Sequence, residues 1–231
     1  MAPNPMKIAL FLEEAGLEYE PIAIDSRRGH QHSPAYKAIN PNAKVPALVD
    51  GDAVVFDSNA ILLYLAEKTG KFLPDDDDVA RAQLLSWLMF IASGVGPFSG
   101  QAVHFRNFAI GSNPYSENRY DYEAKRHWQI IDDQLAKQKY MLGDKYTIVD
   151  MSVWGWASRI PFMLGVENLD PYPHLNRLME EIDARPAAKR TVTLDQGHAF
   201  KPELDEEALR YMYPQNYDGD KALFVDEPEE N

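Results

Sequence analysis

The sequence predicts an α/β fold for the first part of the chain and an all-helical fold for the rest. Two short runs rich in β-branched residues, VPALVD (45–50) and AVVF (53–56), come early and are followed by KFLPDDDD (71–78). Proline and an unbroken acidic run are typical of a linker. From Val79 onward apolar residues recur at helical spacing. We therefore expect three segments: an α/β domain at 1–74, an all-helical domain at 79–200 and an acidic extension at 201–231.

The first domain is expected to alternate helices and strands. A helix over 7–16 is predicted because its apolar residues repeat at helical spacing and Gly16 suits a C-terminal stop. YEPIAI (19–24) predicts a short strand. The strands 45–50 and 53–56 are joined by Asp-Gly-Asp, which is a hairpin signal. A helix over 58–70, ending at a glycine, completes this domain.

The second domain is expected to contain only helices. Thr147 and Asp150 have the spacing of a capping box, with Asp in place of the usual Glu, ahead of an apolar helix. The predicted helices cover 81–94, 118–138, 151–160 and a segment from His174 that stops near Pro186.

Composition excludes several classes of function. The formal net charge of −13 should repel nucleic acid and anionic membranes. The chain has no cysteine, which excludes disulfides, thiolate metal sites and a cysteine nucleophile. Its histidines include no His-x₃-His pair, so we expect no metal. Neither a signal peptide nor an apolar run of membrane-spanning length is evident, and we expect a cytoplasmic protein.

Two dipeptides suggest a peptide-binding site. Asp57-Ser58 precedes a predicted helix, whose N-terminus has free N–H groups and a positive dipole. Such an end can hold a carboxylate while the aspartate binds an ammonium group, which together describe an α-amino acid. The alternative is helix capping with no ligand. If the Val45-Pro46 bond is cis, the Val45 backbone can pair with an extended peptide, and Lys44 offers a cation to a second carboxylate.

The order of these features resembles the cytosolic glutathione transferases. APNPMKIALFLEE, GHQHSPAYKAINPNAKVPAL, GPFSGQAVHF and NPYSENRYDYE are similar to segments of the bacterial Nu class and its fungal prion-like relatives. The resemblance implies a thioredoxin-like N-terminal domain, a helical C-terminal domain, a homodimer, and glutathione as substrate in disulfide reduction, thiol transfer or detoxification of electrophiles. It also implies that Thr147–Asp150 is the family's helix capping box.

The resemblance also implies roles for individual residues. Asn4 would approach the glutathione sulfur, and an amide that cannot take a proton would act by stabilising a thiolate. Arg119 would reach the neighbour's site across a dimer interface. His104, Phe105 and Tyr115 would line the acceptor pocket, with helix packing as the alternative for them. The remaining glutathione contacts would come from Gln31 and Lys44 at the glycyl end, Val45 and Pro46 at the cysteinyl backbone, and Asp57 and Ser58 at the γ-glutamyl group.

This sequence departs from the family at both ends. The first β-strand of the family is missing, because Met1 is followed at once by Ala-Pro-Asn-Pro. A truncated or misassigned start, a reorganised sheet and a degenerate member are the three explanations. If the protein is a degenerate member, its function would be that of a non-catalytic binding or interaction domain, which is the alternative to an enzyme. A third function would be storage of an electrophile or another ligand. The extension, with Tyr211, Tyr213, Tyr217 and Phe224, either packs over the substrate side or wraps the surface.

Overall fold

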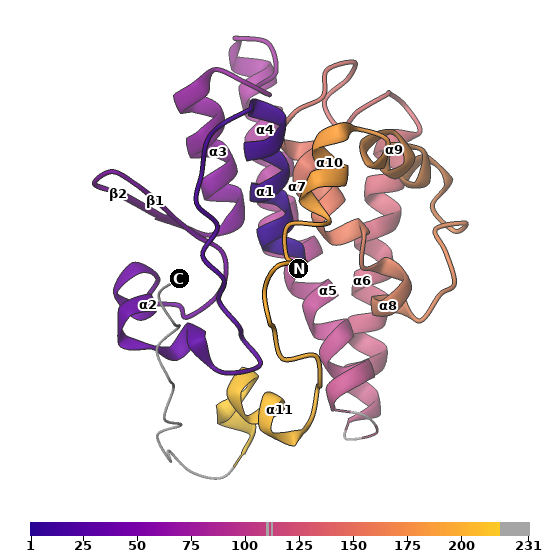
Figure 1. Ribbon diagram of the computed structural model, residues 1–231. Helices are drawn as coiled ribbons and strands as arrows, with labels where there is room; N and C mark the ends of the chain where they lie inside the picture. The colour runs from indigo at the N-terminus through magenta and orange to yellow at the C-terminus, as the bar shows by residue number, and fades with distance from the viewer. Residues whose placement is uncertain (110, 112, 218–231) are drawn as a thin grey trace. The chain divides into compact units, whose positions relative to one another are not determined.

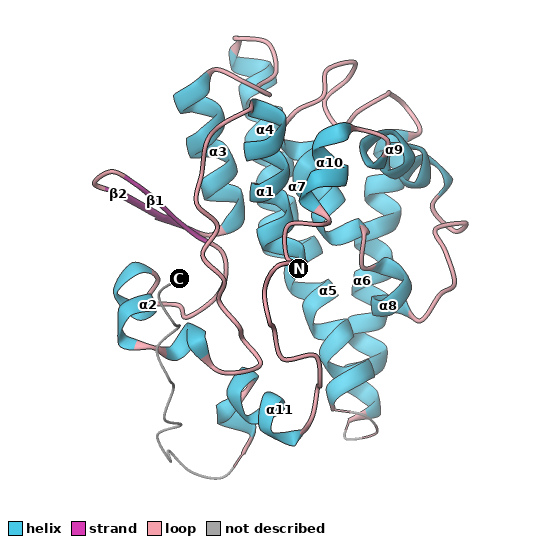
Figure 2. Ribbon diagram, viewed as in Figure 1, coloured by secondary structure: helices cyan, strands magenta, loops and turns pink. Residues whose placement is uncertain are grey.

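The computed structural model describes residues 1–109, 111 and 113–217. Its chain divides into two compact units. One, the helical unit, comprises Met1–Leu17 and Ser58–Thr193, and the other, the hairpin unit, comprises Glu18–Asp57 and the described residues from Leu194 onward. Figure 2 shows that helices dominate and that the described strands form a single small sheet.

The helical unit is built around α1 (Pro3–Ala15), which packs against α7 (Ile148–Ala157), α10 (Pro186–Thr191) and α3 (Ser58–Thr69) (Figure 1). Its other helices are α4 (Asp78–Phe90), α5 (Gly96–Val103), α6 (Pro114–Leu135), α8 (Ile160–Leu164) and α9 (Pro173–Asp183). Two π-helical segments, Ile91–Val95 and His104–Phe108, flank α5.

The core of this unit explains why α1 lies where it does. Leu10 and Phe11 of α1 and Trp154 of α7 are almost completely buried. Gly155 allows the two helices to approach closely, since a Cβ there would come within 2.6 Å of the carbonyl oxygen of Pro3. The predicted capping box starts α7, with the Asp150 carboxylate accepting from the Thr147 N–H.

Several helices begin earlier than the sequence predicts. The first starts at Pro3, not Lys7, because proline is favoured in the first turn of a helix. The longest starts at Pro114, where the side chain of Asn113 accepts from the Ser116 N–H. The helix predicted from His174 ends at Asp183, and Pro186 opens α10.

The hairpin unit contains the two-stranded sheet. Strands β1 (Ala47–Asp50) and β2 (Ala53–Phe56) pair antiparallel with Ala47 opposite Phe56. Helix α2 (Pro34–Ile39) and helix α11 (Glu206–Met212) lie in the same unit, with 3₁₀ turns at His30–His32 and Pro214–Asn216. The predicted strand at 19–24 is wrong, since those residues have no regular structure. A strand needs a neighbour to satisfy its backbone, and the described sheet offers it none.

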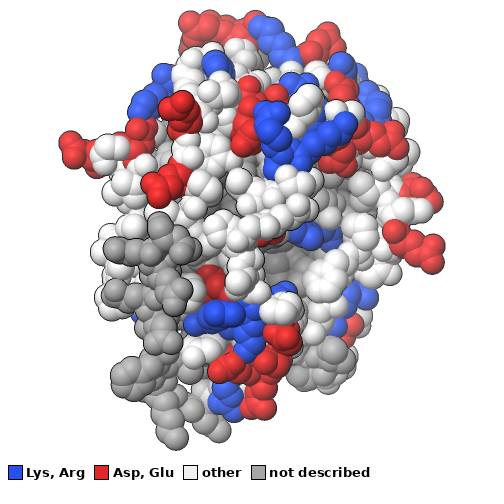
Figure 3. Space-filling view, viewed as in Figure 1, with Lys and Arg blue, Asp and Glu red and all other residues white. Residues whose placement is uncertain are grey.

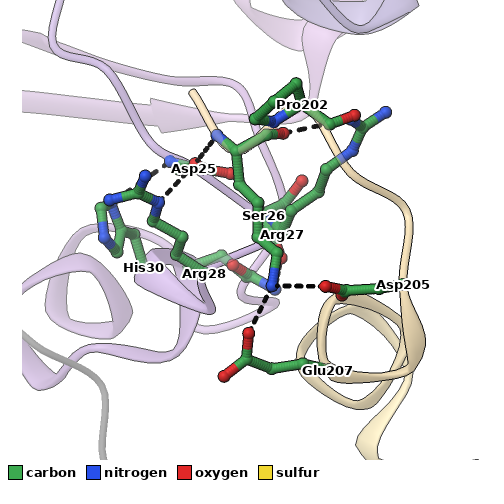
Figure 4. A network of polar contacts seen from close by, with 10 residues as sticks. Asp25, Ser26, Arg27, Arg28, His30, Pro202, Asp205 and Glu207 are labelled. Carbon is green, nitrogen blue, oxygen red and sulfur yellow. Dashed lines mark hydrogen bonds and ion pairs between the residues drawn. The ribbon is translucent and has the colours of Figure 1, made fainter. Parts of the chain in front are cut away.

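A polar network ties the C-terminal segment into the hairpin unit (Figure 4). The buried Asp25 carboxylate accepts from the backbone N–H groups of Arg27 and Lys201, at 2.9 and 2.7 Å. The Arg27 guanidinium donates to the carbonyls of Lys201 and Pro202. The described part of the extension therefore packs on the chain around residues 25–31, whereas Phe224 lies outside the described residues.

Charges of both signs are interspersed on the face that Figure 3 shows. Figure 3 shows Lys and Arg side chains beside Asp and Glu side chains on the face in view. In the helical unit, Arg185 pairs with Glu14 and Arg190 with Glu13, so α10 is also held to α1 by ion pairs. The helical run Asp78–Phe108 is long and apolar enough to cross a membrane by length and composition alone, a test that core helices of globular proteins also pass.

Candidate functional site

The N-terminus of α3 carries a polar cluster built around a buried lysine. The Lys7 Nζ lies 3.2 Å from the Ser58 hydroxyl oxygen and 3.4 Å from the Asn59 carboxamide oxygen. Lys7 is 2% exposed, so its ammonium charge is removed from water and needs these partners. Because the Ser58 oxygen accepts from the ammonium, its own proton is directed toward another acceptor. Ser58 is thus a donor next to the Lys7 amino group.

Asp57 precedes this cluster in an unusual backbone conformation. Its φ of 72° lies in the left-handed region, which non-glycine residues seldom occupy. Such conformations are concentrated at functional sites, where the surrounding structure holds them. The conformation of Asp57 and the burial of Ser58 are compatible with a binding site at the start of α3, which stays a prediction.

Asn4 lies in the first turn of α1. Its carboxamide oxygen accepts a hydrogen bond of 3.0 Å from the indole N–H of Trp156 on α7. The N-terminus of this 13-residue helix adds a positive dipole end close to Asn4. The arrangement suits stabilisation of an anion, such as a thiolate, by N–H donors.

Four more of the predicted residues lie in the hairpin unit. The Val45–Pro46 peptide bond is cis. The backbone just before it is anchored, because the Lys44 carbonyl accepts from the Tyr36 hydroxyl at 2.8 Å and from the Asn40 amide at 2.6 Å. Burial raises the pKa of Tyr36, so its hydroxyl stays protonated as a donor.

Gln31 is buried and engaged with the C-terminal segment. Its amide nitrogen donates to the carbonyl of Tyr211 at 3.1 Å, and the ring of Tyr211 packs on Gly29. Its carboxamide oxygen is buried without a hydrogen-bond partner among the described residues. An orphaned buried acceptor of this kind calls for a donor.

The predicted acceptor-pocket residues are only partly brought together. The rings of His104 and Phe105 meet edge to face, with centroids 5.4 Å apart, and burial lowers the pKa of His104. Phe105 also stacks on Tyr120 at 5.4 Å. Tyr115 is 79% exposed at the start of α6. Arg119, one turn further along, pairs with Glu123 of the same helix at 2.8 Å.

The site residues thus fall into two sets. Asn4 and Ser58 belong to the helical unit, together with the predicted pocket residues and Arg119. Gln31, Lys44, Val45–Pro46 and Asp57 belong to the hairpin unit.

Lys7 is the residue that sequence reasoning missed. The signal was a lone cation within the apolar face of a helix, one turn after Asn4. No group of three or more potential metal ligands occurs in the part of the chain that the structure describes.

Comparison with known proteins identifies the family. The model of the glutathione S-transferase N-terminal domain matches residues 1–67, and a model of the glutathione S-transferase C-terminal domain matches residues 108–190. The chain belongs to the glutathione S-transferase family. The predicted fold class is confirmed, although the described sheet has two strands where the sequence predicts three.

Two curated relatives and one solved structure show which members of the family this chain is similar to. The chain is 40% identical to the disulfide-bond oxidoreductase YghU of Escherichia coli over 206 residues, which are 81% of this chain and 70% of the relative. It is 39% identical to the disulfide-bond oxidoreductase YfcG of the same organism over 192 residues, covering 80% and 88% of the two chains. A solved structure of the glutathione transferase URE2P6 from Phanerochaete chrysosporium, in complex with oxidized glutathione, is similar with a TM-score of 0.77 and 32% identity, covering 85% and 93%.

Proposed function

We propose that this glutathione transferase reduces disulfides with glutathione and transfers thiols, with no cysteine of its own in the reaction. The observation that carries the proposal is the α3 N-terminus, where the buried Lys7 ammonium holds the Ser58 hydroxyl next to Asp57. This group has the donors and charges that an α-amino acid requires. The names of the two oxidoreductase relatives support the type of reaction.

Glutathione presents three features that the proposed residues match. Its γ-glutamyl carboxylate would accept from Ser58 and the α3 N-terminus, and its ammonium group would meet Asp57. The cysteinyl backbone would pair with Val45 before the cis Pro46. The glycyl carboxylate would meet Lys44, and Gln31 would contact the same end of the peptide.

The chemistry would then be thiol–disulfide exchange at the bound sulfur. The amide N–H of Asn4 and the α1 N-terminus stabilise the thiolate of glutathione, and Asn4 takes no proton. That thiolate attacks one sulfur of the substrate disulfide, forms a mixed disulfide and expels the other sulfur as a thiolate, which takes a proton from water. A second glutathione thiolate attacks the mixed disulfide, which releases the reduced thiol and oxidised glutathione.

The proposal includes a dimeric assembly and a binding site for the disulfide or electrophile. The active form is a cytoplasmic homodimer in which Arg119 reaches the site of the partner. His104, Phe105 and Tyr115 contact the disulfide or electrophile, and the neutral imidazole favoured by the lowered pKa of His104 suits contact with an apolar group.

Calorimetric titration with reduced and oxidised glutathione tests the proposal. Both should bind, and the protein should reduce hydroxyethyl disulfide with glutathione in an assay coupled to glutathione reductase. Two truncated ligands provide the control. Cysteinylglycine lacks the γ-glutamyl group and should not bind, whereas γ-glutamylcysteine should bind more weakly than glutathione. Absence of binding by a folded dimer would overturn the proposal in favour of a non-catalytic interaction domain.

A further inference from the structure

The hydrogen bond between Asn4 and Trp156 fixes which end of the Asn4 carboxamide faces the indole. An indole N–H can only donate, whereas a carboxamide has one accepting oxygen and one NH₂ group. The 3.0 Å bond from Trp156 therefore selects the Asn4 oxygen. The opposite orientation would bring two donors face to face and leave the indole N–H unpaired. The bond thus directs the NH₂ group of Asn4 away from the indole.

The indole itself is fixed by small residues on two helices. Gly155, next to it on α7, brings the backbone of α7 close to Pro3 and Lys7 of α1. On α5, a Cβ at Gly96 would lie 3.2 Å from the indole nitrogen, and one at Gly100 would lie 3.8 Å from the far edge of the ring. The ring therefore lies against a glycine face of α5, and its N–H points to Asn4.

We propose that Trp156 is a positioning residue that sets the orientation of the Asn4 amide, so that its NH₂ group is the donor for the glutathione sulfur. This inference rests on the proposed role of Asn4 and adds a residue that makes the role possible. Without the indole N–H, the carboxamide can rotate and present its oxygen to the sulfur. An oxygen lone pair next to a thiolate disfavours the thiolate, and a share of the bound glutathione would then be in the unreactive thiol form.

The test compares Trp156→Phe with Trp154→Phe. Phenylalanine removes the N–H donor and keeps an aromatic ring. Trp154 is the matched control, because it lies on the same helix and its indole N–H donates to Asp183. The thiol pKa of bound glutathione, followed by the ultraviolet absorbance of the thiolate, should rise by about one unit in Trp156→Phe, and kcat should fall about tenfold at a pH below that pKa. The KM for glutathione should change little. The control should retain the wild-type thiol pKa.

Asn4→Ala and the double variant separate this inference from the proposed function. Asn4→Ala should raise the thiol pKa at least as much as Trp156→Phe, and the double variant should be no worse than Asn4→Ala alone. A wild-type pKa in Trp156→Phe, with a raised pKa in Asn4→Ala, overturns the positioning role and leaves the proposed function intact. A wild-type pKa in Asn4→Ala overturns the positioning role of Trp156 together with the proposed role of Asn4, whereas the proposed function itself is tested by the calorimetric titration. Additive effects in the double variant show that Trp156 acts by another route, and also overturn the inference.

A second replacement covers the case in which Trp156→Phe fails to fold. Substitution of Trp156 by 3-benzothienylalanine exchanges the N–H for sulfur in a ring of nearly the same shape, so packing against Gly96 is retained. The same rise in the thiol pKa is expected. A wild-type pKa with this residue overturns the inference.

Discussion

Replacement of Asp150 by alanine should be among the most destabilising single changes in this chain. The carboxylate is buried and accepts three hydrogen bonds: from the Met141 N–H at 2.8 Å, from the Thr147 N–H at 2.8 Å and from the Thr147 hydroxyl at 3.2 Å. Alanine would leave two backbone N–H groups buried without a partner, while Thr147 would still cap α7 through the Val149 N–H. Each orphaned donor costs about 1–3 kcal/mol. The free energy of unfolding should fall by about 2–6 kcal/mol.

Asp150→Asn is the finer probe, because it keeps one accepting oxygen and removes the ionisation. Its NH₂ group would oppose one of the two N–H donors, so a loss of about 1–3 kcal/mol is expected near neutral pH. Urea unfolding at fixed protein concentration, followed by tryptophan fluorescence and circular dichroism, measures both variants. Asp133→Asn, an exposed change on α6, is the control and should stay within about 0.5 kcal/mol of wild type.

The wild-type protein should also show a pH dependence at this carboxyl. Burial outweighs the three donors and raises the pKa of Asp150 to about 7. Because this pKa lies above that of the unfolded chain, the folded state binds the proton more tightly. The resulting stabilisation is fully present below about pH 4 and is lost as the pH rises through 7. The advantage of wild type over Asp150→Asn should therefore shrink between about pH 4 and 7. A constant or growing advantage, or a loss below about 1 kcal/mol for Asp150→Ala, would refute the reasoning.

Three further predictions concern the site and its support. Ser58→Ala should weaken glutathione binding about 10- to 100-fold by calorimetry, since it removes a hydrogen bond to a carboxylate, and it should lower the stability slightly because Lys7 loses a partner; unchanged affinity would remove the amino-acid site from α3. Arg119→Ala should lower glutathione affinity in the dimer yet leave the unfolding free energy within about 0.5 kcal/mol, because Arg119 itself is exposed and Glu123 keeps Arg126 as a partner; an affinity equal to wild type would contradict the shared site. Gly155→Ala should cost about 1–3 kcal/mol and reduce turnover by separating α1 from α7, whereas Gly197→Ala, which meets no neighbouring atom, should not; equal melting temperatures for the two would contradict the close approach.

Much of the local structure follows from the sequence alone. The hairpin at Asp50-Gly51-Asp52, the helix from Ser58 and the capping box at Thr147 depend on neighbours within a few residues, and the structure confirms them. The order of these elements also sufficed to indicate the glutathione transferase family, which the family models confirm. Such features are readable because turn, cap and periodicity signals act over short stretches of chain.

The tertiary structure decided the features that join distant segments. YEPIAI has the composition of a strand but pairs with no strand of the described sheet. A β-strand forms only when a neighbouring strand accepts and donates its backbone hydrogen bonds. In the sequence, Lys7 is one polar residue of a predicted helix. Its contact with Ser58, which is 51 residues further along the chain, exists only because α3 packs on α1. The bond between Asn4 and Trp156 spans 152 residues and depends on a glycine that lets two helices touch. The residue types were present in the sequence, but the approach of α1, α3 and α7 decides which of them meet, because burial and hydrogen bonding act through space.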